Sequence, residues 1–156
     1  YSVWAAAPEP LKERLKGVME KLRAEFGGPA FEPHVTVVGA IRMTEDDAIR
    51  PYNVRFTAVG RGTFFYQCVF LLVDPTPEVV EASAHSSSHF GYKSSSPYMP
   101  HLSLLYGDLA NDVKERAKEK VKLLDPEICD LSFEVTRLSL YRTDTEDKSL
   151  KSWEKI

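Results

Sequence analysis

The sequence is poor in cysteine and holds no long apolar run, and each shortage excludes a class of protein. Cys68 and Cys129 are the two cysteines of this 156-residue chain, too few for a disulfide scaffold and without metal-binding Cys-x-x-Cys spacing. No apolar stretch approaches the roughly 20 residues that a membrane-spanning helix needs. No basic-then-apolar leader opens the chain, so secretion is not indicated. We therefore expect a cytoplasmic protein that has no membrane partner.

A strong excess of positive charge is also lacking, which limits the size of any nucleic-acid partner. The formal net charge is -3, and no cluster of lysine and arginine stands out. Proteins that bind long RNA or DNA usually carry a basic face, because neutralising phosphates supplies most of their affinity. We expect a small phosphorylated ligand, no long nucleic acid, and a single domain over residues 1–156 that acts as a monomer.

The chain does contain one eight-residue pattern, written twice. Residues 31–38 and 98–105 both read aromatic, any residue, proline, histidine, aliphatic, hydroxyl, aliphatic, aliphatic. A single His-x-Thr/Ser is a weak signal, but the repeated pattern with proline in register is much stronger. The alternative interpretation is two buried strands that each carry a satisfied histidine.

Strand geometry turns this repeat into a predicted site. Side chains alternate between the two faces of a strand, so His34 and Thr36 share one face, as do His101 and Ser103. Aliphatic residues occupy the opposite face of both strands. Two such strands facing each other would set two imidazoles and two hydroxyls around one small anion.

The elements around the two motifs follow the same order, strand, helix, histidine strand, helix, strand. The hydrophobic pattern predicts helices over residues 11–26, 77–90 and 111–124 and strands over residues 2–7, 34–38, 54–59, 63–73, 101–106 and 131–141. The histidines are separated by close to half the chain, which suggests duplicated units over about 1–66 and 67–156. Thr44 starts a helix that Pro51 stops too soon, so we hypothesise that residues are absent between Arg50 and Pro51.

Two histidines can divide acid–base work, since imidazole titrates near neutral pH. One neutral ring would accept the proton of an attacking water, and the other, protonated, would give a proton to the leaving oxygen. Thr36 and Ser103 would hold the non-bridging phosphate oxygens. No metal or other cofactor is suggested: the chain has four histidines and no His-x-His. His85 and His89 could form a metal pair on one helix face, but a polar surface turn is favoured because no third ligand is visible.

The same chemistry restricts the substrate. A relaxed phosphodiester is a hard target without a metal, whereas a five-membered cyclic phosphate is strained and easier to open. Nucleoside 2′,3′-cyclic phosphates and related ribose cyclic phosphates therefore fit these residues.

The two motifs, residues 33–37 and 100–104, resemble the paired motifs of the two-histidine (2H) phosphoesterase superfamily, and most closely those of plant cyclic phosphodiesterases. Further segments that look like these relatives are residues 1–5, 62–65, 67–72, 97–100 and 143–148. The resemblance implies an α+β, bilobal (LigT-like) fold, with two antiparallel sheets and outer helices related by a pseudo-two-fold around a central cleft. It also implies that Tyr106 matches a tyrosine near the phosphate.

The activity that the resemblance implies is hydrolysis of ADP-ribose 1″,2″-cyclic phosphate to ADP-ribose 1″-phosphate, a step downstream of tRNA splicing. Ring opening of nucleoside 2′,3′-cyclic phosphates to 2′-phosphates is implied as well. Two alternatives stay open: a non-catalytic module that binds nucleotides or RNA ends, and a ligase-type member acting on 2′,5′ linkages. The acidic net charge argues against the ligase.

Aromatic residues near the motifs are candidates for contact with the substrate. Trp4, Phe64 and Tyr98 could stack on a base or ribose, although aromatics in strands are more often core. Strand parity places Tyr106 on the face opposite His101, so a phosphate-binding Tyr106 requires a bend or a strand end. The serine-rich stretch 83–96 is expected to be a loop, either flexible or a lid over the site.

Overall fold

The computed structural model describes residues 1–39, 51–93 and 97–156. The helices are α1 (Leu11–Phe26), α2 (Pro77–His89) and α3 (Asn111–Leu124), with short 3-10 turns η1 (Phe65–Gln67) and η2 (Ile128–Asp130). The strands are β1 (Ser2–Ala6), β2 (His34–Gly39), β3 (Tyr52–Arg61), β4 (Val69–Val73), β5 (His101–Leu105), β6 (Ser132–Val135), β7 (Ser139–Arg142) and β8 (Glu154–Lys155). Thr44 and the hypothesised gap after Arg50 lie outside the described residues.

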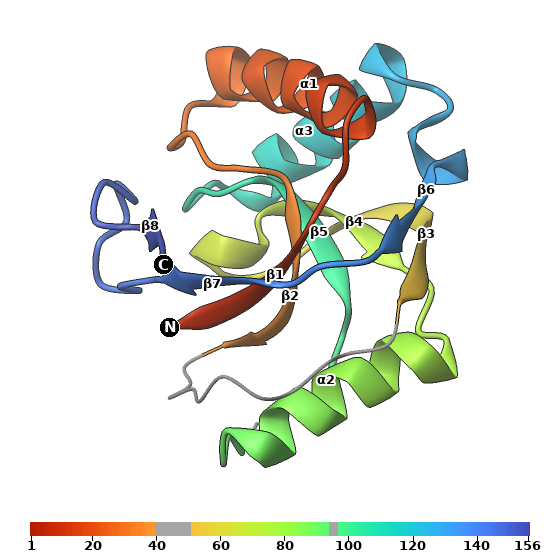
Figure 1. Ribbon diagram of the computed structural model, residues 1–156. Coiled ribbons are helices and arrows are strands. Elements are labelled where there is room, and N and C mark those ends of the chain that lie inside the picture. Colours follow the sequence, from red (N-terminus) through yellow and green to blue (C-terminus); the bar gives the residue numbers. More distant parts are fainter. Residues whose placement is uncertain (40–50, 94–96) are drawn as a thin grey trace.

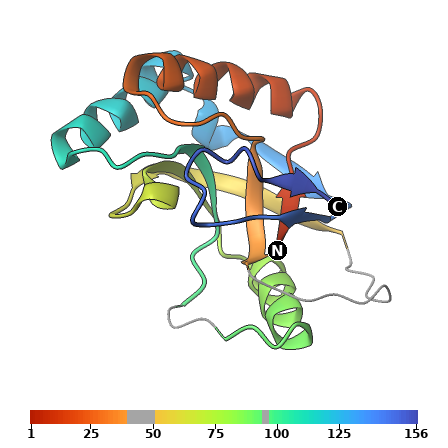
Figure 2. The ribbon, with the colours of Figure 1, turned by 90° about the vertical axis from the view of Figure 1, so that its left-hand side faces the viewer.

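The strands form one curled antiparallel sheet in which the two histidine strands are central. The order is β6-β3-β4-β5-β2-β1-β7-β8, so four strands lie on each side of the junction between β5 and β2. That junction is narrow, with Val35 opposite Leu102. Helices α1 and α3 lie together on one side of the sheet and α2 on the other (Figures 1 and 2). The predicted α+β class and antiparallel architecture are confirmed.

Each half of the sheet takes strands from distant parts of the chain. β3 pairs with β4, whereas β7 returns to pair with β1 near the chain start (Figure 1). The units β1–α1–β2 and β4–α2–β5 share one order and each ends in a histidine strand. A duplication over about 1–66 and 67–156 stays a prediction.

Local sequence explains the elements that flank the site. In α1, one apolar stripe is buried, formed by Leu15, Val18, Met19 and Leu22. The aliphatic residues between and after the motif residues are buried in the core, namely Val35, Val37, Leu102 and Leu104. Cys68 is also fully buried and packs as a small hydrophobe, as expected. Nowhere in the described part of the chain is a helix both long and apolar enough to cross a membrane.

Three predicted segments were wrong in detail. The strand predicted over residues 63–73 is interrupted by η1, and Gly62 approaches the Gln67 carbonyl so closely that a Cβ would lie 2.3 Å from it. Residues 131–141 divide into β6 and β7, because these strands join opposite halves of the sheet. The helix predicted over residues 77–90 is confirmed as α2, so the loop expected over 83–96 was wrong as far as His89: Ser86 is buried, and its hydroxyl donates to the Ala82 carbonyl. Residues 94–96 of that stretch lie outside the described residues.

Candidate active site

The register of the two central strands brings both motifs to one cavity. Because Val35 lies opposite Leu102, one step in each direction sets His34 opposite Ser103 and Thr36 opposite His101. Side chains directly opposite on neighbouring strands lie about 5 Å apart at Cβ. All four motif residues line one cavity of about 360 Å³. The expected convergence of two imidazoles and two hydroxyls is therefore present.

Both imidazoles are held in the same tautomer by the main chain. Nδ1 of His34 lies 2.6 Å from the Glu32 carbonyl oxygen, and Nδ1 of His101 lies 2.8 Å from that of Met99. A carbonyl oxygen can only accept, so Nδ1 carries the proton and donates in each ring. Nε2 is thus the unprotonated nitrogen of each neutral ring, able to accept a proton.

His34 is the more enclosed of the two imidazoles. Its residue is 3% exposed, and the Trp4 indole stacks on its ring at a centroid distance of 3.4 Å and an interplanar angle of 6°. His34 still lines the cavity. Among the described residues, the buried side-chain atoms that lack a hydrogen bond do not include Nε2 of His34. Burial lowers the pKa of His34 to about 4, against the backbone bond to Glu32 and with help from the nearby His101.

His101 has a more open environment on the other strand. Its ring is half-buried and lies 5.1 Å from the Phe70 ring centroid. Burial lowers the pKa of His101 below its ordinary value of 6.5, and the hydrogen bond to the Met99 carbonyl opposes that shift. The pKa of each imidazole is therefore below neutral pH before any anion binds.

The Ser103 hydroxyl belongs to a short hydrogen-bond chain. Ser103 Oγ donates to the Tyr66 carbonyl at 3.1 Å and also bonds to the Tyr106 hydroxyl. Tyr106 follows directly after β5 ends at Leu105, which resolves the parity conflict and lets its ring line the cavity. The ring is buried against Phe31, and burial raises the pKa of Tyr106 above its ordinary range. A neutral Tyr106 can thus donate to Ser103 or to a phosphate oxygen.

The three aromatic residues expected to stack on the substrate differ in how available their rings are in the structure. Phe64 is 52% exposed and lines the cavity, so its ring is available. Trp4 lines the cavity too, but His34 and Tyr141 occupy both of its faces. Tyr98 does not belong to the cavity wall: its hydroxyl donates to the Thr36 carbonyl at 2.8 Å, which holds β2 in place.

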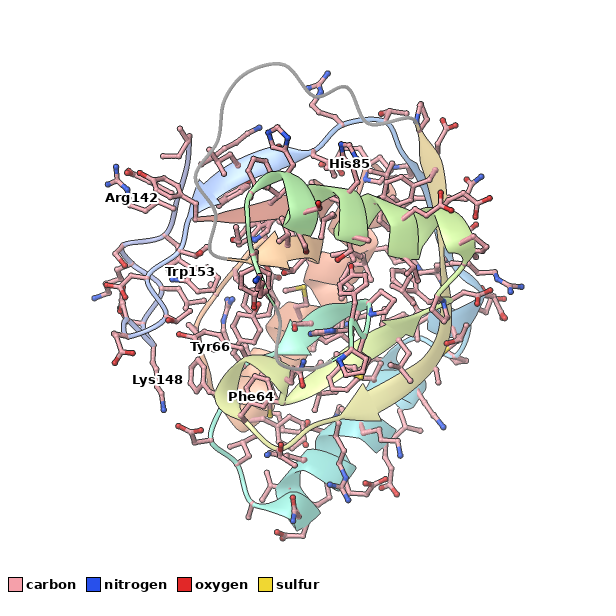
Figure 3. All side chains as sticks on the ribbon, turned by 90° about the horizontal axis from the view of Figure 1, so that it is seen from below. Phe64, Tyr66, His85, Arg142, Lys148 and Trp153 are labelled. Atoms are coloured by element: carbon pink, nitrogen blue, oxygen red, sulfur yellow. The ribbon has the colours of Figure 1, made fainter. Side chains whose placement is uncertain are left out.

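Four further aromatic residues, which the sequence patterns did not single out as candidates, line the cavity: Tyr1, Tyr66, Tyr92 and Trp153. Tyr66 stacks on Trp153 at a centroid distance of 5.7 Å and lies near Phe64, while His85 lies on α2 well away from them (Figure 3). Tyr66 was hidden inside a segment expected to be regular strand. Trp153 is remote in sequence from both motifs, so no local signal could connect it with them.

The loop that carries Trp153 is organised by one carboxylate. Asp147 accepts hydrogen bonds from the backbone N–H and hydroxyl groups of both Ser149 and Ser152, at 2.6 to 3.0 Å. These bonds hold the pKa of Asp147 well below its usual value. Trp153 Nε1 donates to the Asp144 carbonyl, and the Tyr66 hydroxyl donates to that of Thr145. The loop thereby fixes the aromatic wall of the cavity.

Nothing in the described residues gathers three histidine, cysteine, aspartate or glutamate side chains as metal ligands. The rings of His85 and His89 are stacked along α2 at a centroid distance of 6.5 Å. They do not line the cavity that holds the motifs.

Comparison with known proteins agrees with this geometry. A family model described as the 2′-5′ RNA ligase superfamily matches residues 7–147. A cyclic phosphodiesterase of Arabidopsis thaliana is 47% identical over 166 residues, covering 100% of this chain and 92% of the relative. A cyclic phosphodiesterase of Triticum aestivum is 32% identical over 91 residues, covering 58% of this chain and all of the relative. The resemblance of the two motifs is thus confirmed, and the chain belongs to the 2′-5′ RNA ligase (2H phosphoesterase) superfamily.

Proposed function

We propose that the protein is a metal-independent cyclic phosphodiesterase. Its substrates are ADP-ribose 1″,2″-cyclic phosphate, opened to ADP-ribose 1″-phosphate, and nucleoside 2′,3′-cyclic phosphates, opened to nucleoside 2′-phosphates. The observation that carries the proposal is the pair of imidazoles with Nδ1 bonded to the main chain, across one cavity from two hydroxyls. Full-length similarity to a cyclic phosphodiesterase supports the same reaction class.

The reaction follows from the free Nε2 atom on each ring. Water attacks phosphorus as one neutral imidazole accepts its proton at Nε2. The bond from phosphorus to one ring oxygen breaks, and the other imidazole, protonated, delivers its Nε2 proton to that oxygen. Thr36 and Ser103 donate to the non-bridging oxygens, where negative charge is held in the transition state. Ser103 must turn its proton from the Tyr66 carbonyl to do so.

The cavity favours small cyclic phosphates over polymers. Its volume of about 360 Å³ fits a nucleotide-sized ligand. The exposed Phe64 ring and the Tyr66 ring give a nucleobase a surface on which to stack. A role downstream of tRNA splicing is the context in which we place the ADP-ribose substrate.

Removal of either imidazole tests the mechanism. His34→Ala and His101→Ala should each lower kcat on adenosine 2′,3′-cyclic phosphate by about 10²- to 10⁴-fold, the usual contribution of a general acid or base. His85→Ala, on α2 outside the cavity, should keep the full rate, and excess EDTA should not change the rate of the unsubstituted protein. Chromatography of the products checks all of these. Near-full turnover by either cavity variant would falsify the mechanism.

The same assay separates the alternatives. A module that only binds nucleotides would retain the cyclic phosphate unchanged, although binding alone would not require two imidazoles and two hydroxyls. A ligase-type member would join RNA ends through 2′,5′ linkages, and the net charge of -3 disfavours the RNA binding which that reaction needs.

A further inference from the structure

Ser2 carries a buried hydroxyl without a partner. The residue is 6% exposed, and its Oγ is the one buried side-chain nitrogen or oxygen without a hydrogen bond among residues 1–39, 51–93 and 97–156. Leaving a buried hydroxyl unbonded is unfavourable, and such groups in folded proteins are usually satisfied. This hydroxyl therefore calls for a bond from outside the chain.

The Ser2 side chain lies on the face of β1 that borders the cavity. Ser2 lines the same cavity as His34 and Thr36. Strand alternation puts Ser2 on the side of Trp4, whose ring covers His34, whereas Val3 and Ala5 belong to the core. β1 lies between β2 and β7 in the sheet (Figure 1).

The strand register places Ser2 about one sugar ring away from the phosphate position. Thr36 on β2 pairs with Trp4, and Ser2 lies two residues before Trp4 on β1, where it pairs with Gly39 beyond a register shift between Val3 and Trp4. Two strand residues span roughly 6.6 Å. That step is too long for a phosphate held by Thr36 and Ser103, but it suits the ribose attached to that phosphate.

The two ends of the cavity differ in chemistry. Tyr66 belongs to the far end, because its carbonyl accepts from Ser103, which lies opposite His34. Its ring and that of Phe64 suit the apolar faces of a base. At the Ser2 end, Tyr141 pairs with Ser2, and Thr143, just beyond the end of β7, lines the cavity and adds a second hydroxyl to the wall. This end suits a polar sugar substituent.

We infer that the Ser2 hydroxyl binds the oxygen on carbon 5 of the substrate ribose while the base lies against Phe64 and Tyr66. The inference rests on the proposed function, since it names a substrate contact within that site. In a nucleoside cyclic phosphate this oxygen is the free 5′-hydroxyl. In an ADP-ribose cyclic phosphate the equivalent oxygen carries the diphosphate. Ser2 thereby contacts the sugar of the substrate and not its phosphate.

A double-mutant cycle between protein and substrate tests the contact. The two substrates are adenosine 2′,3′-cyclic phosphate and its 5′-deoxy analogue, and the two proteins are the unsubstituted chain and Ser2→Ala. We expect either single change to lower kcat/KM about tenfold, and the second change to add almost nothing. Ser2→Ala should melt at the same temperature or higher, because it removes an unbonded buried hydroxyl.

Ser139→Ala provides the matched control, since Ser139 pairs with Trp4 from β7 but does not line the cavity. It should leave kcat/KM unchanged on both substrates. Independent, multiplying losses in the cycle, or full activity of Ser2→Ala on the normal substrate, would overturn the inference. A lower melting temperature of Ser2→Ala would overturn it as well, since the hydroxyl would then be structural. Failure of the unsubstituted protein on both substrates would instead refute the proposed function.

Discussion

At the residue scale, the pKa of each imidazole in the site depends on how much water reaches the ring. Trp4 covers one face of His34, and burial lowers the pKa of His34 to about 4. The pKa of His101 is lowered by the same cause. A histidine that acts as a base must be neutral and one that acts as an acid must be protonated, so both requirements fall on the acidic side of pH 6.5.

The pH dependence of kcat/KM follows from these shifts. We expect a bell with its maximum between about 4 and 6.5, since rate is lost as the base is protonated at low pH and as the acid is deprotonated at higher pH. Trp4→Ala should expose His34 and raise its pKa, so the limb of the pH profile that His34 controls should move up by ~1 pH unit or more. Tyr92→Ala, which also alters the cavity wall, should leave that limb in place. A maximum above neutral pH would contradict the assignment.

The placement of single residues at the cavity could be predicted from sequence where the signal is local. His34, Thr36, His101 and Ser103 were found because strand alternation and a repeated motif are properties of neighbouring positions. Trp4 was expected to stack on substrate, yet its ring is occupied by His34, a contact that arises only when β1 and β2 pair. Ser2 gave no sequence signal at all, because an unbonded hydroxyl exists only in the folded chain.

At the scale of elements, the loop between β7 and β8 supports the aromatic wall through Asp147. Its two carboxylate oxygens accept four hydrogen bonds from Ser149 and Ser152, immediately before Trp153. Trp153 in turn contacts Trp4 and Tyr66. The two imidazoles stand on β2 and β5, so we expect this loop to affect how substrate is held more than how it reacts.

Loss of the Asp147 carboxylate should therefore separate binding from chemistry. We expect Asp147→Ala to raise KM roughly tenfold, equivalent to about 1.4 kcal/mol of substrate binding, with kcat changed much less. Glu146→Ala is the matched control, because the bond of Glu146 to Asp144 uses its backbone N–H and not its carboxylate. Steady-state kinetics on a cyclic nucleotide measures both values. An equal loss in kcat would mean that the loop positions the reacting groups instead.

Elements with a complete local pattern were predictable, whereas those defined by partners were not. The stripe of Leu15, Val18 and Leu22 predicted α1 over the residues that it occupies. The division of residues 131–141 into β6 and β7 depends on two different neighbours, β3 and β1. Helix periodicity can be read along the chain, but strand exchange requires knowledge of the whole sheet.

At the scale of the whole molecule, two four-stranded halves meet at the strands that carry the two histidine motifs. Among the described strands, the junction between β2 and β5 is the one place where the halves of the sheet are joined by strand pairing. The formal net charge of the chain is -3, and the cavity is sized for a nucleotide. We expect such a molecule to bind a polyanion only weakly along its length.

Substrate length should therefore bring no advantage. An oligoribonucleotide that ends in a 2′,3′-cyclic phosphate should have a KM within about threefold of the mononucleotide, and log kcat/KM should fall against log salt with a slope of about -1 or shallower. The measurement is a salt series with both substrates. A slope of roughly -4, or RNA bound tens of times more tightly, would show a basic path for the chain of phosphates.

The prolines of the two motifs explain why each imidazole finds a carbonyl at Nδ1. The accepting carbonyls belong to Glu32 and Met99, the residues directly before Pro33 and Pro100. A following proline restricts such a residue to extended geometry, so its carbonyl direction is settled before the histidine is placed. Many catalytic histidines are oriented by an acidic side chain, which a single substitution can delete. Here the orienting group is a main-chain carbonyl, which no side-chain substitution removes. The proton therefore stays on the same nitrogen when neighbouring side chains change.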